Sequence, residues 1–325
     1  MRKVFWGGEA WVLIGLFLVV IAANRMWMGT TDTQAYLEFF DEFESFEVAV
    51  RRFEPGFVLV ASQLKFFNVA GFYFLLVIAS IGIGLKIFAI RMYAPFAALS
   101  LAVYLSKYFV LQDMVQIRAG VATAIFLLSI KYIKKRNFIA FSLSIAFACL
   151  FHYSALIYII IYFISSNRLT IRLLFFVMIG VLLINYFYGL NIFFINLAAN
   201  YFNKVKINME LISILDPMEF KNLNIELILN CIIFSLFLYY SKLLAFKYQY
   251  FEIWFKSYSL GIFFSLFFLQ FPVFSFRISE MLLVTSIFIF PLIIVLFRDR
   301  IIGYGVFWLL NFAIGYNYYI KQEMF

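Results

Sequence analysis

Apolar runs alternate with short polar or charged clusters along the whole chain. A helix needs about 20 apolar residues to cross a bilayer, and its backbone hydrogen bonds are satisfied internally. The pattern therefore predicts an all-α fold, a polytopic integral membrane helical bundle. We expect about 9–11 transmembrane segments, some of them re-entrant or half-span helices. The clearest predicted spans are 10–25, 71–90, 95–111, 117–133, 171–189, 226–241, 257–271, 280–297 and 301–319.

Basic clusters between the apolar runs predict the orientation, because cytoplasmic loops are enriched in Lys and Arg. Lys134-Lys135-Arg136 is the strongest such cluster. We expect the same side to hold Arg2/Lys3, Lys86/Arg91, Arg168/Arg172, Lys242/Lys247/Lys256 and Arg298/Arg300. This arrangement requires 138–164 to form two half-spans, 138–150 and 153–164, that meet near His152. Segment 54–68 is short for a full crossing, so we interpret it as re-entrant or interfacial on the outer face.

No internal repeat or soluble segment divides the chain, so we predict one transmembrane domain, 1–325, with outer loops 26–54 and 190–225. A composition of 66% hydrophobic and 13% charged residues excludes an ordinary soluble domain, in which about a quarter of residues are charged. The net charge of +9 lies in short clusters between apolar runs. It therefore indicates orientation and contact with anionic lipid, and nucleic acid is not an expected partner.

A few ionisable residues lie at the predicted depth of the membrane, where such groups are energetically unfavourable. Charged groups there usually face a cavity or the bundle interior. Under the predicted topology we expect six residues to converge at the outer membrane–water boundary: Arg25, Asp32, Glu54, Arg118, His152 and Arg277. Several arginines facing one cavity would suit a phosphate or pyrophosphate, because the guanidinium fork matches phosphate oxygens.

Each of these residues also has a purely structural interpretation. Arg118 could extend to the interface, although Gln116 and Asp113 make this helix end polar. His152, the only histidine, could be a satisfied core residue or an acid–base group.

The remaining candidates are equally open. Asp32 and Tyr36 share a face if their segment is helical, where the neighbouring threonines could act as caps. Glu54 could simply start a helix, and Arg277, placed at the beginning of 280–297 with Glu280 near it, could be an interfacial anchor.

Taken in order, short motifs along the chain form a recognisable series. An arginine closes the first helix, and later motifs are Gly29 to Tyr36 (GTTDTQAY), Glu54 to Phe57 (EPGF), Gln116 to Ala119 (QIRA) and Phe151 to Ile157 (FHYSALI). The series resembles the EpsG/Wzy-type polysaccharide polymerases, the O-antigen and capsule repeat-unit polymerases of bacterial inner membranes. The resemblance covers residues 10–165, and beyond them only Arg277 is similar. The doubled threonine adds one residue between Gly29 and Asp32.

The resemblance implies a metal-independent glycosyltransferase without a cofactor, in the bacterial inner membrane, with its active site facing the periplasm. Its substrates would be oligosaccharide repeat units linked to undecaprenyl pyrophosphate, polymerised into O-antigen, capsule or exopolysaccharide. Arg118 and Arg277, with Arg25 and Gln116, would bind the pyrophosphate. His152, Asp32 or Glu54 would be the base, while Tyr36 and Tyr153 would contact sugars. A chain-length regulator and a flippase are implied as partners.

Two other functions remain open. A flippase or transporter for the same lipid-linked sugars would also need arginines in a cavity, but such folds usually contain internal repeats, and none is visible. A membrane O-acyltransferase could use His152 to activate a sugar hydroxyl, yet it would leave the arginines and Asp32 without a role. A length ladder of the surface polysaccharide distinguishes all three.

Overall fold

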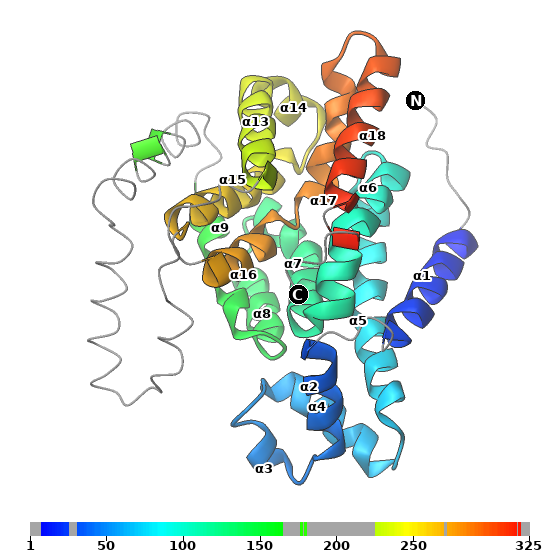
Figure 1. Cartoon of the computed structure of the whole chain (residues 1–325). Helices are drawn as coiled ribbons and strands as arrows, with labels where there is room; N and C mark the ends of the chain where they lie inside the picture. The colour runs from blue at the N-terminus through cyan, green and yellow to red at the C-terminus, as the bar shows by residue number, and fades with distance from the viewer. Residues whose placement is uncertain are drawn as a thin grey trace. The chain divides into compact units, whose positions relative to one another are not determined.

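The computed structural model describes residues 8–25, 31–164, 176–177, 179–180, 225–269, 272–316 and 318–319. Every element in this part of the chain is a helix (Figure 1), which confirms the prediction of an all-α membrane protein. The chain divides into two compact units. The first unit comprises Met1–Ile159 and Ser286–Phe325, and the second comprises Ile160–Thr285.

The N-terminal part of the first unit is a series of helices. They are α1 (Gly8–Ala23), α2 (Thr31–Asp41), α3 (Phe46–Ala49), α4 (Pro55–Phe66), α5 (Gly71–Tyr93), α6 (Ala97–Val103), the π-helix η2 (Tyr104–Val115), α7 (Ile117–Lys134), α8 (Phe138–Cys149) and the 3₁₀-helix η3 (Tyr153–Tyr158). Helix α5 packs between α1 and α7, and α7 packs against α8. The C-terminal part adds α17 (Ser286–Ile289), the 3₁₀-helix η4 (Phe290–Leu296) and α18 (Arg300–Tyr316).

The second unit is built around α15 (Phe251–Phe267), which packs against α16 (Pro272–Leu283) and α13 (Ile225–Tyr239). Helix α14 (Ser241–Lys247) follows α13, and α9 (Ile159–Phe163) begins at the boundary of the unit. Lys256 is buried within α15 and donates hydrogen bonds to the carbonyl oxygens of Ile161 and Ile164, at 3.2 and 2.8 Å. Lys256 therefore has internal partners, and its predicted location on the cytoplasmic side stays a prediction.

Among the described residues, α5 is the one helix long and apolar enough to cross a membrane unbroken. The number rises to three if two bent pairs each form a span: Glu226–Tyr239 with Ser241–Lys247, and Ser275–Leu283 with Ser286–Leu296. The predicted span 280–297 overlaps the second pair, but it is not one continuous helix, because α16 ends at Leu283 and α17 begins at Ser286. Span 171–189, apart from four residues, and loop 190–225, apart from its last residue, lie outside the described residues.

The predicted division of 138–164 is confirmed. Helix α8 ends at Cys149, the chain turns through Leu150–His152, and η3 begins at Tyr153. The carbonyl oxygen of Leu150 accepts a hydrogen bond from the backbone N–H of Gly56 at 2.7 Å, so it serves another helix instead of continuing its own. This break brings His152 to the start of α4.

Helices α1 and α5 run antiparallel. A β-carbon at Gly8 would lie 3.3 Å from the guanidinium of Arg91, so the start of α1 meets the end of α5. About two turns before the end of α5, Lys86 is fully buried and forms an ion pair with Asp113 at 2.8 Å. Lys86, which lies within the predicted span 71–90, therefore has its partner inside the helical bundle.

Candidate active site

Glu54 joins three separate parts of the first unit. It lies directly before α4, and its Oε2 accepts a hydrogen bond from Nη1 of Arg118, at the start of α7, at 2.5 Å. Its Oε1 lies 3.0 Å from Nδ1 of His152, in the turn after α8. Glu54 is only 4% exposed, while the side chains of Arg118 and His152 are 25% and 23% exposed. The carboxylate thus holds a cation and an imidazole that both reach the surface.

The local sequence explains how Glu54 reaches these partners. Pro55 occupies the first turn of α4, where its missing N–H and fixed φ favour a helix start. Gly56 lets this helix start approach the turn after α8, because a β-carbon there would lie 2.8 Å from the carbonyl oxygen of Leu150. In this sequence Glu54 therefore supplies the carboxylate, Pro55 starts the helix, and Gly56 allows the close backbone contact.

Three aromatic rings surround the guanidinium of Arg118. Its Cζ lies 4.9 Å from the ring centre of Phe53, 5.7 Å from that of Tyr36 and 5.9 Å from that of Phe57. We call these three rings the aromatic cage. Rings over a guanidinium attract it electrostatically and restrict its orientation. Nε of Arg118 is buried and has no hydrogen-bond partner among the described residues.

The electrostatics of the site keep Glu54 ionised. Burial alone would raise the pKa of Glu54, but the hydrogen bond with His152 and the charge and hydrogen bond of Arg118 outweigh it. The pKa of Glu54 is held at about 2, against 4.5 for an ordinary glutamate. For Tyr36, burial raises the pKa above its usual value, and the charges of Arg118 and Arg25 oppose this rise. Both arginines therefore act on the same phenol.

The structure places three further candidates close to this group. Asp32 is half-buried in the first turn of α2, one helical turn before Tyr36, and its charge also raises the pKa of that tyrosine after the larger effect of burial. Gln116 is half-buried at the junction of η2 and α7, two residues before Arg118. Arg25 follows α1 and is fully buried.

Two candidates remain, Tyr153 in the first unit and Arg277 in the second. The ring of Tyr153 is 59% exposed on η3. Arg277 belongs to the second unit, where it is exposed inside α16. It does not begin a helix, which corrects the predicted start at residue 280.

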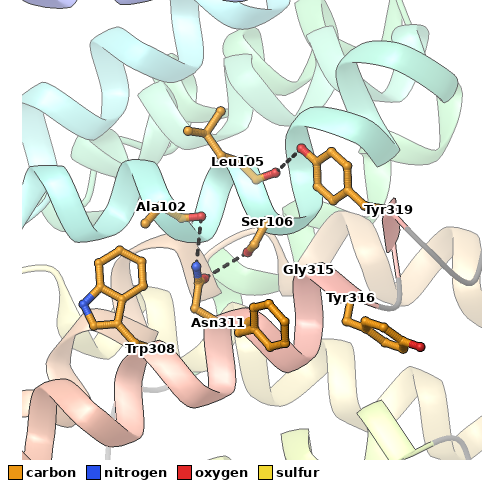
Figure 2. A pocket seen from close by; sticks show the side chains of 9 residues that line it. Ala102, Leu105, Ser106, Trp308, Asn311, Gly315, Tyr316 and Tyr319 are labelled. Atoms are coloured by element: carbon orange, nitrogen blue, oxygen red, sulfur yellow. Dashed lines mark hydrogen bonds between the residues drawn. The ribbon is translucent and has the colours of Figure 1, made fainter.

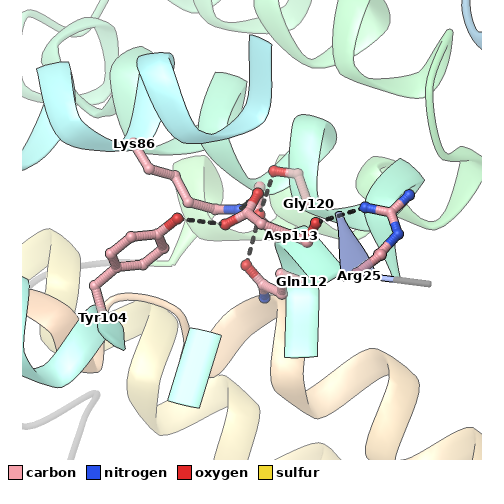
Figure 3. A network of polar contacts seen from close by, with 7 residues as sticks. Arg25, Lys86, Tyr104, Gln112, Asp113 and Gly120 are labelled. Carbon is pink, nitrogen blue, oxygen red and sulfur yellow. Dashed lines mark hydrogen bonds and ion pairs between the residues drawn. The ribbon is translucent and has the colours of Figure 1, made fainter. Parts of the chain in front are cut away.

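A second polar cluster is fully buried in the first unit (Figure 3). Asp113 accepts hydrogen bonds from Nζ of Lys86 at 2.8 Å and from the hydroxyl of Tyr104 at 2.7 Å. The backbone carbonyl of Asp113 accepts a hydrogen bond from Nη1 of Arg25 at 3.1 Å. Nε and Nη2 of Arg25 have no hydrogen-bond partner in the described part of the chain. Sequence reasoning missed this cluster, because Lys86 and Asp113 lie 27 residues apart.

An apolar groove of about 520 Å³ lies between η2 and α18 (Figure 2). Its polar groups bind one another: Ser106 donates to Oδ1 of Asn311 at 2.9 Å, and the Tyr319 hydroxyl donates to the carbonyl of Leu105 at 2.6 Å. The exposed rings of Trp308 and Phe312 line it. Within the described residues, no three His, Cys, Asp or Glu side chains gather in a way that could hold a metal ion.

Comparison with known proteins identifies the family of this chain. Over 168 residues the chain is 27% identical to the amylovoran biosynthesis protein AmsC of Erwinia amylovora, a match that covers 48% of this chain and 45% of that protein. The chain thus matches less than half the length of this relative. No solved structure matches. The model of the EpsG family matches residues 10–323, nearly the whole chain, and the chain therefore belongs to the EpsG family.

Proposed function

We propose that this protein is a polysaccharide polymerase that acts on lipid-linked repeat units at the outer face of the bacterial inner membrane. It would transfer a growing glycan from undecaprenyl pyrophosphate to a sugar hydroxyl of another lipid-linked unit. Membership of the EpsG family and similarity to an amylovoran biosynthesis protein support polysaccharide biosynthesis. The observation that carries the chemistry is Glu54, which joins Arg118 and His152 in one partly exposed site.

The arginines would stabilise the leaving group. When the bond between the sugar C1 and the pyrophosphate oxygen breaks, negative charge develops on that oxygen. A guanidinium fixed in place stabilises such charge without reorganising, and it suits phosphate oxygens. Arg118, oriented by the aromatic cage, and Arg25, with two donors free of partners among the described residues, are the first candidates. Arg277 remains a third candidate, and Gln116 could donate a further hydrogen bond.

His152 is the candidate base for the acceptor hydroxyl. With Nδ1 on Glu54, its Nε2 is the atom that can take the proton as the new C1–oxygen bond forms. A carboxylate on the opposite nitrogen fixes the tautomer and stabilises the imidazolium that results. A pKa of about 2 makes Glu54 a weak base, so we assign it a positioning role and keep Asp32 as the alternative base. Tyr36 and Tyr153 would contact sugar rings.

The positions of the basic residues favour a periplasmic site. Arg118 lies at the start of α7, whereas Lys134 ends it, and Lys135 and Arg136 follow. The 18 residues of this helix separate its ends by about 27 Å, nearly the thickness of the hydrocarbon core, although Arg118, Lys131 and Lys134 make it less apolar than α5. Basic clusters mark the cytoplasmic side, so the opposite end of α7, with the site, would face the periplasm.

The test is the length ladder of the surface polysaccharide in a strain that lacks this gene. The strain is complemented with the wild type, Arg118→Ala or His152→Ala, each at matched protein level. Ser154→Ala is the matched control, because Ser154 is exposed two residues from His152. We expect single repeat units in the deletion strain and with both site variants, and a full ladder with the wild type and the control.

Other patterns would contradict the proposal. If the deletion removed even the single unit, the protein would act in lipid-linked sugar transport. A ladder of normal length with altered acetylation would indicate an acyltransferase. A normal ladder with Arg118→Ala would refute the role of this arginine in pyrophosphate binding.

A further inference from the structure

The buried cluster around Asp113 joins α5, η2 and the segment that follows α1 (Figure 3). Lys86 belongs to α5, and Arg25 lies two residues after the end of α1. Tyr104 begins η2, and Asp113 lies near the end of the same helix. The exposed fractions of these side chains are 2% or less. Lys86, Tyr104 and Asp113 therefore have no direct access to substrate, whereas Nε and Nη2 of Arg25 have no hydrogen-bond partner among the described residues.

Stability alone does not explain this cluster. Removing two charges from water costs several kcal/mol per ion, and apolar replacements of buried ion pairs are often neutral or stabilising. Two glycines, Gly82 and Gly120, also lie against the carboxylate of Asp113. A β-carbon at Gly82 would lie 2.8 Å from Oδ1 of Asp113, and one at Gly120 would lie 3.1 Å from the same atom and collide with the carbonyl of Gln112. A larger residue at either glycine would clash, so the position of this carboxylate requires glycine at both sites.

The position of Asp113 in the chain indicates what the cluster achieves. Its side chain is held by Lys86 and Tyr104, and its carbonyl in turn holds the guanidinium of Arg25. The π-helix ends two residues after Asp113, at Val115, and the N–H of Gln116 is bound to the carbonyl of Leu111 at 2.8 Å. Arg118 follows two residues later. π-helical segments occur often at functional sites, where they displace the residues that follow.

We propose that Asp113 is a positioning residue that sets the placement of Arg25 relative to Arg118. It fixes Arg25 through its carbonyl and Arg118 through the helix junction that it anchors, without touching the substrate. The proposal rests on the proposed function, in which these two arginines bind the pyrophosphate of the lipid-linked substrate. The electrostatic effect of both arginines on Tyr36 agrees with a common site.

The test separates positioning from stability with the all-apolar variant Lys86→Met/Tyr104→Phe/Asp113→Leu. Purified protein in lipid nanodiscs is measured for thermal unfolding and for the Kd of undecaprenyl pyrophosphate. We expect an unfolding temperature at or above that of the wild type. The Kd should rise about five-fold or more, as for coupled neighbours. Ser129→Ala, a buried α7 residue bonded only within its own helix, is the control and should change neither value.

A mutant cycle gives a readout that a purely structural role would not move. Arg25→Ala should weaken binding strongly in the wild-type background and only slightly in the all-apolar background, because the arginine is already displaced there. Equal losses in both backgrounds, or a wild-type Kd in the all-apolar variant, would overturn the role of Asp113. If that variant does not fold, Tyr104→Phe decides: it removes one hydrogen bond from Asp113 and should raise the Kd about two-fold. An unchanged Kd would refute the proposal.

The same measurement distinguishes failure of the underlying function. If Arg25→Ala and Arg118→Ala both bind undecaprenyl pyrophosphate as the wild type does, the arginine site itself is wrong. If these two variants lose binding while the all-apolar variant keeps it, only the role of Asp113 is wrong.

Discussion

At the scale of single residues, the two oxygens of Glu54 serve two different partners. One oxygen neutralises Arg118 and the other orients His152, so loss of the carboxylate leaves a half-buried cation and an imidazole without this partner. Removing one partner of a buried pair costs more than the pair contributes, because the remaining charge is uncompensated. Glu54→Ala is therefore expected to be more damaging than its modest exposure to substrate would suggest.

The low pKa of Glu54 predicts a specific dependence of stability on pH. Its folded-state pKa of about 2 lies below the ordinary 4.5. The stabilisation is therefore complete above pH 4.5 and is lost as pH falls toward 2, and the shift corresponds to about 3 kcal/mol. We expect the difference in unfolding temperature between wild type and Glu54→Gln to shrink over this range. A difference that stayed constant between pH 5 and 2.5 would contradict the ion pairs.

Substitution of His152 by glutamine separates orientation from proton transfer. An amide can still hydrogen-bond to Glu54 but cannot accept the proton of an acceptor hydroxyl. We expect His152→Gln to accumulate to the wild-type level and to lower polymerisation about 100-fold or more, the usual effect of losing a general base. The rate is measured as polymer formed by membranes from lipid-linked units. A rate within a few-fold of the wild type would make His152 a packing residue.

At the scale of helices, the contact between the start of α4 and the turn after α8 decides whether the site forms. Its close approach depends on Gly56. Gly56→Ala would push the two backbones apart and break the 2.7 Å hydrogen bond to Leu150. The added methyl group touches no reacting atom, but it should separate Glu54 from His152.

We expect Gly56→Ala to abolish the polysaccharide ladder and to lower the unfolding temperature. Gly84→Ala is its control, because a β-carbon at Gly84 meets nothing within 4 Å. An alanine at this exposed helical position should be neutral or stabilising by about 0.5–1 kcal/mol. Equal effects of the two substitutions would show that helix propensity, and not the α4 contact, governs the result.

How far the sequence predicted the elements depended on whether the signal was local. The break at His152 was predictable because a polar residue interrupts an apolar run. The break between α16 and α17 was not, since residues 280–297 are apolar throughout apart from Glu280 and two hydroxyl residues. The burial of Lys86 and Lys256 was missed for a related reason. Charge patterns indicate a loop only when the lysine lacks an internal partner, and Asp113 and the α9 carbonyls are distant in sequence.

The candidate site shows the same limit. Glu54, Arg118 and His152 stood out because they are costly in an apolar chain, and the structure brings all three together. Phe53 did not stand out, and Phe57 did so only as the end of the motif Glu54 to Phe57, because single phenylalanines among 46 carry no signal. The aromatic cage is recognisable only once α2 and α4 are packed against the start of α7.

At the scale of the whole molecule, the proposed orientation predicts which residues face the periplasm. Single cysteines are introduced at Ser154, beside the site, and at Asn137, beside the basic cluster, after Cys149 and Cys231 are replaced by serine. Both positions are exposed. In intact spheroplasts, a membrane-impermeant maleimide should label Ser154→Cys and should label Asn137→Cys only after the membrane is permeabilised. The reverse labelling would place the site in the cytoplasm.

The contacts of Glu54 also have a consequence for the order of biosynthesis. Arg118 and His152 follow it by 64 and 98 residues, so neither partner exists when Glu54 leaves the ribosome. The nascent chain must keep this carboxylate hydrated until α7, and then α8, has been inserted. A chain arrested before residue 152 would therefore hold an acid already paired with its arginine but still lacking its imidazole, and it would be inert toward donor substrate.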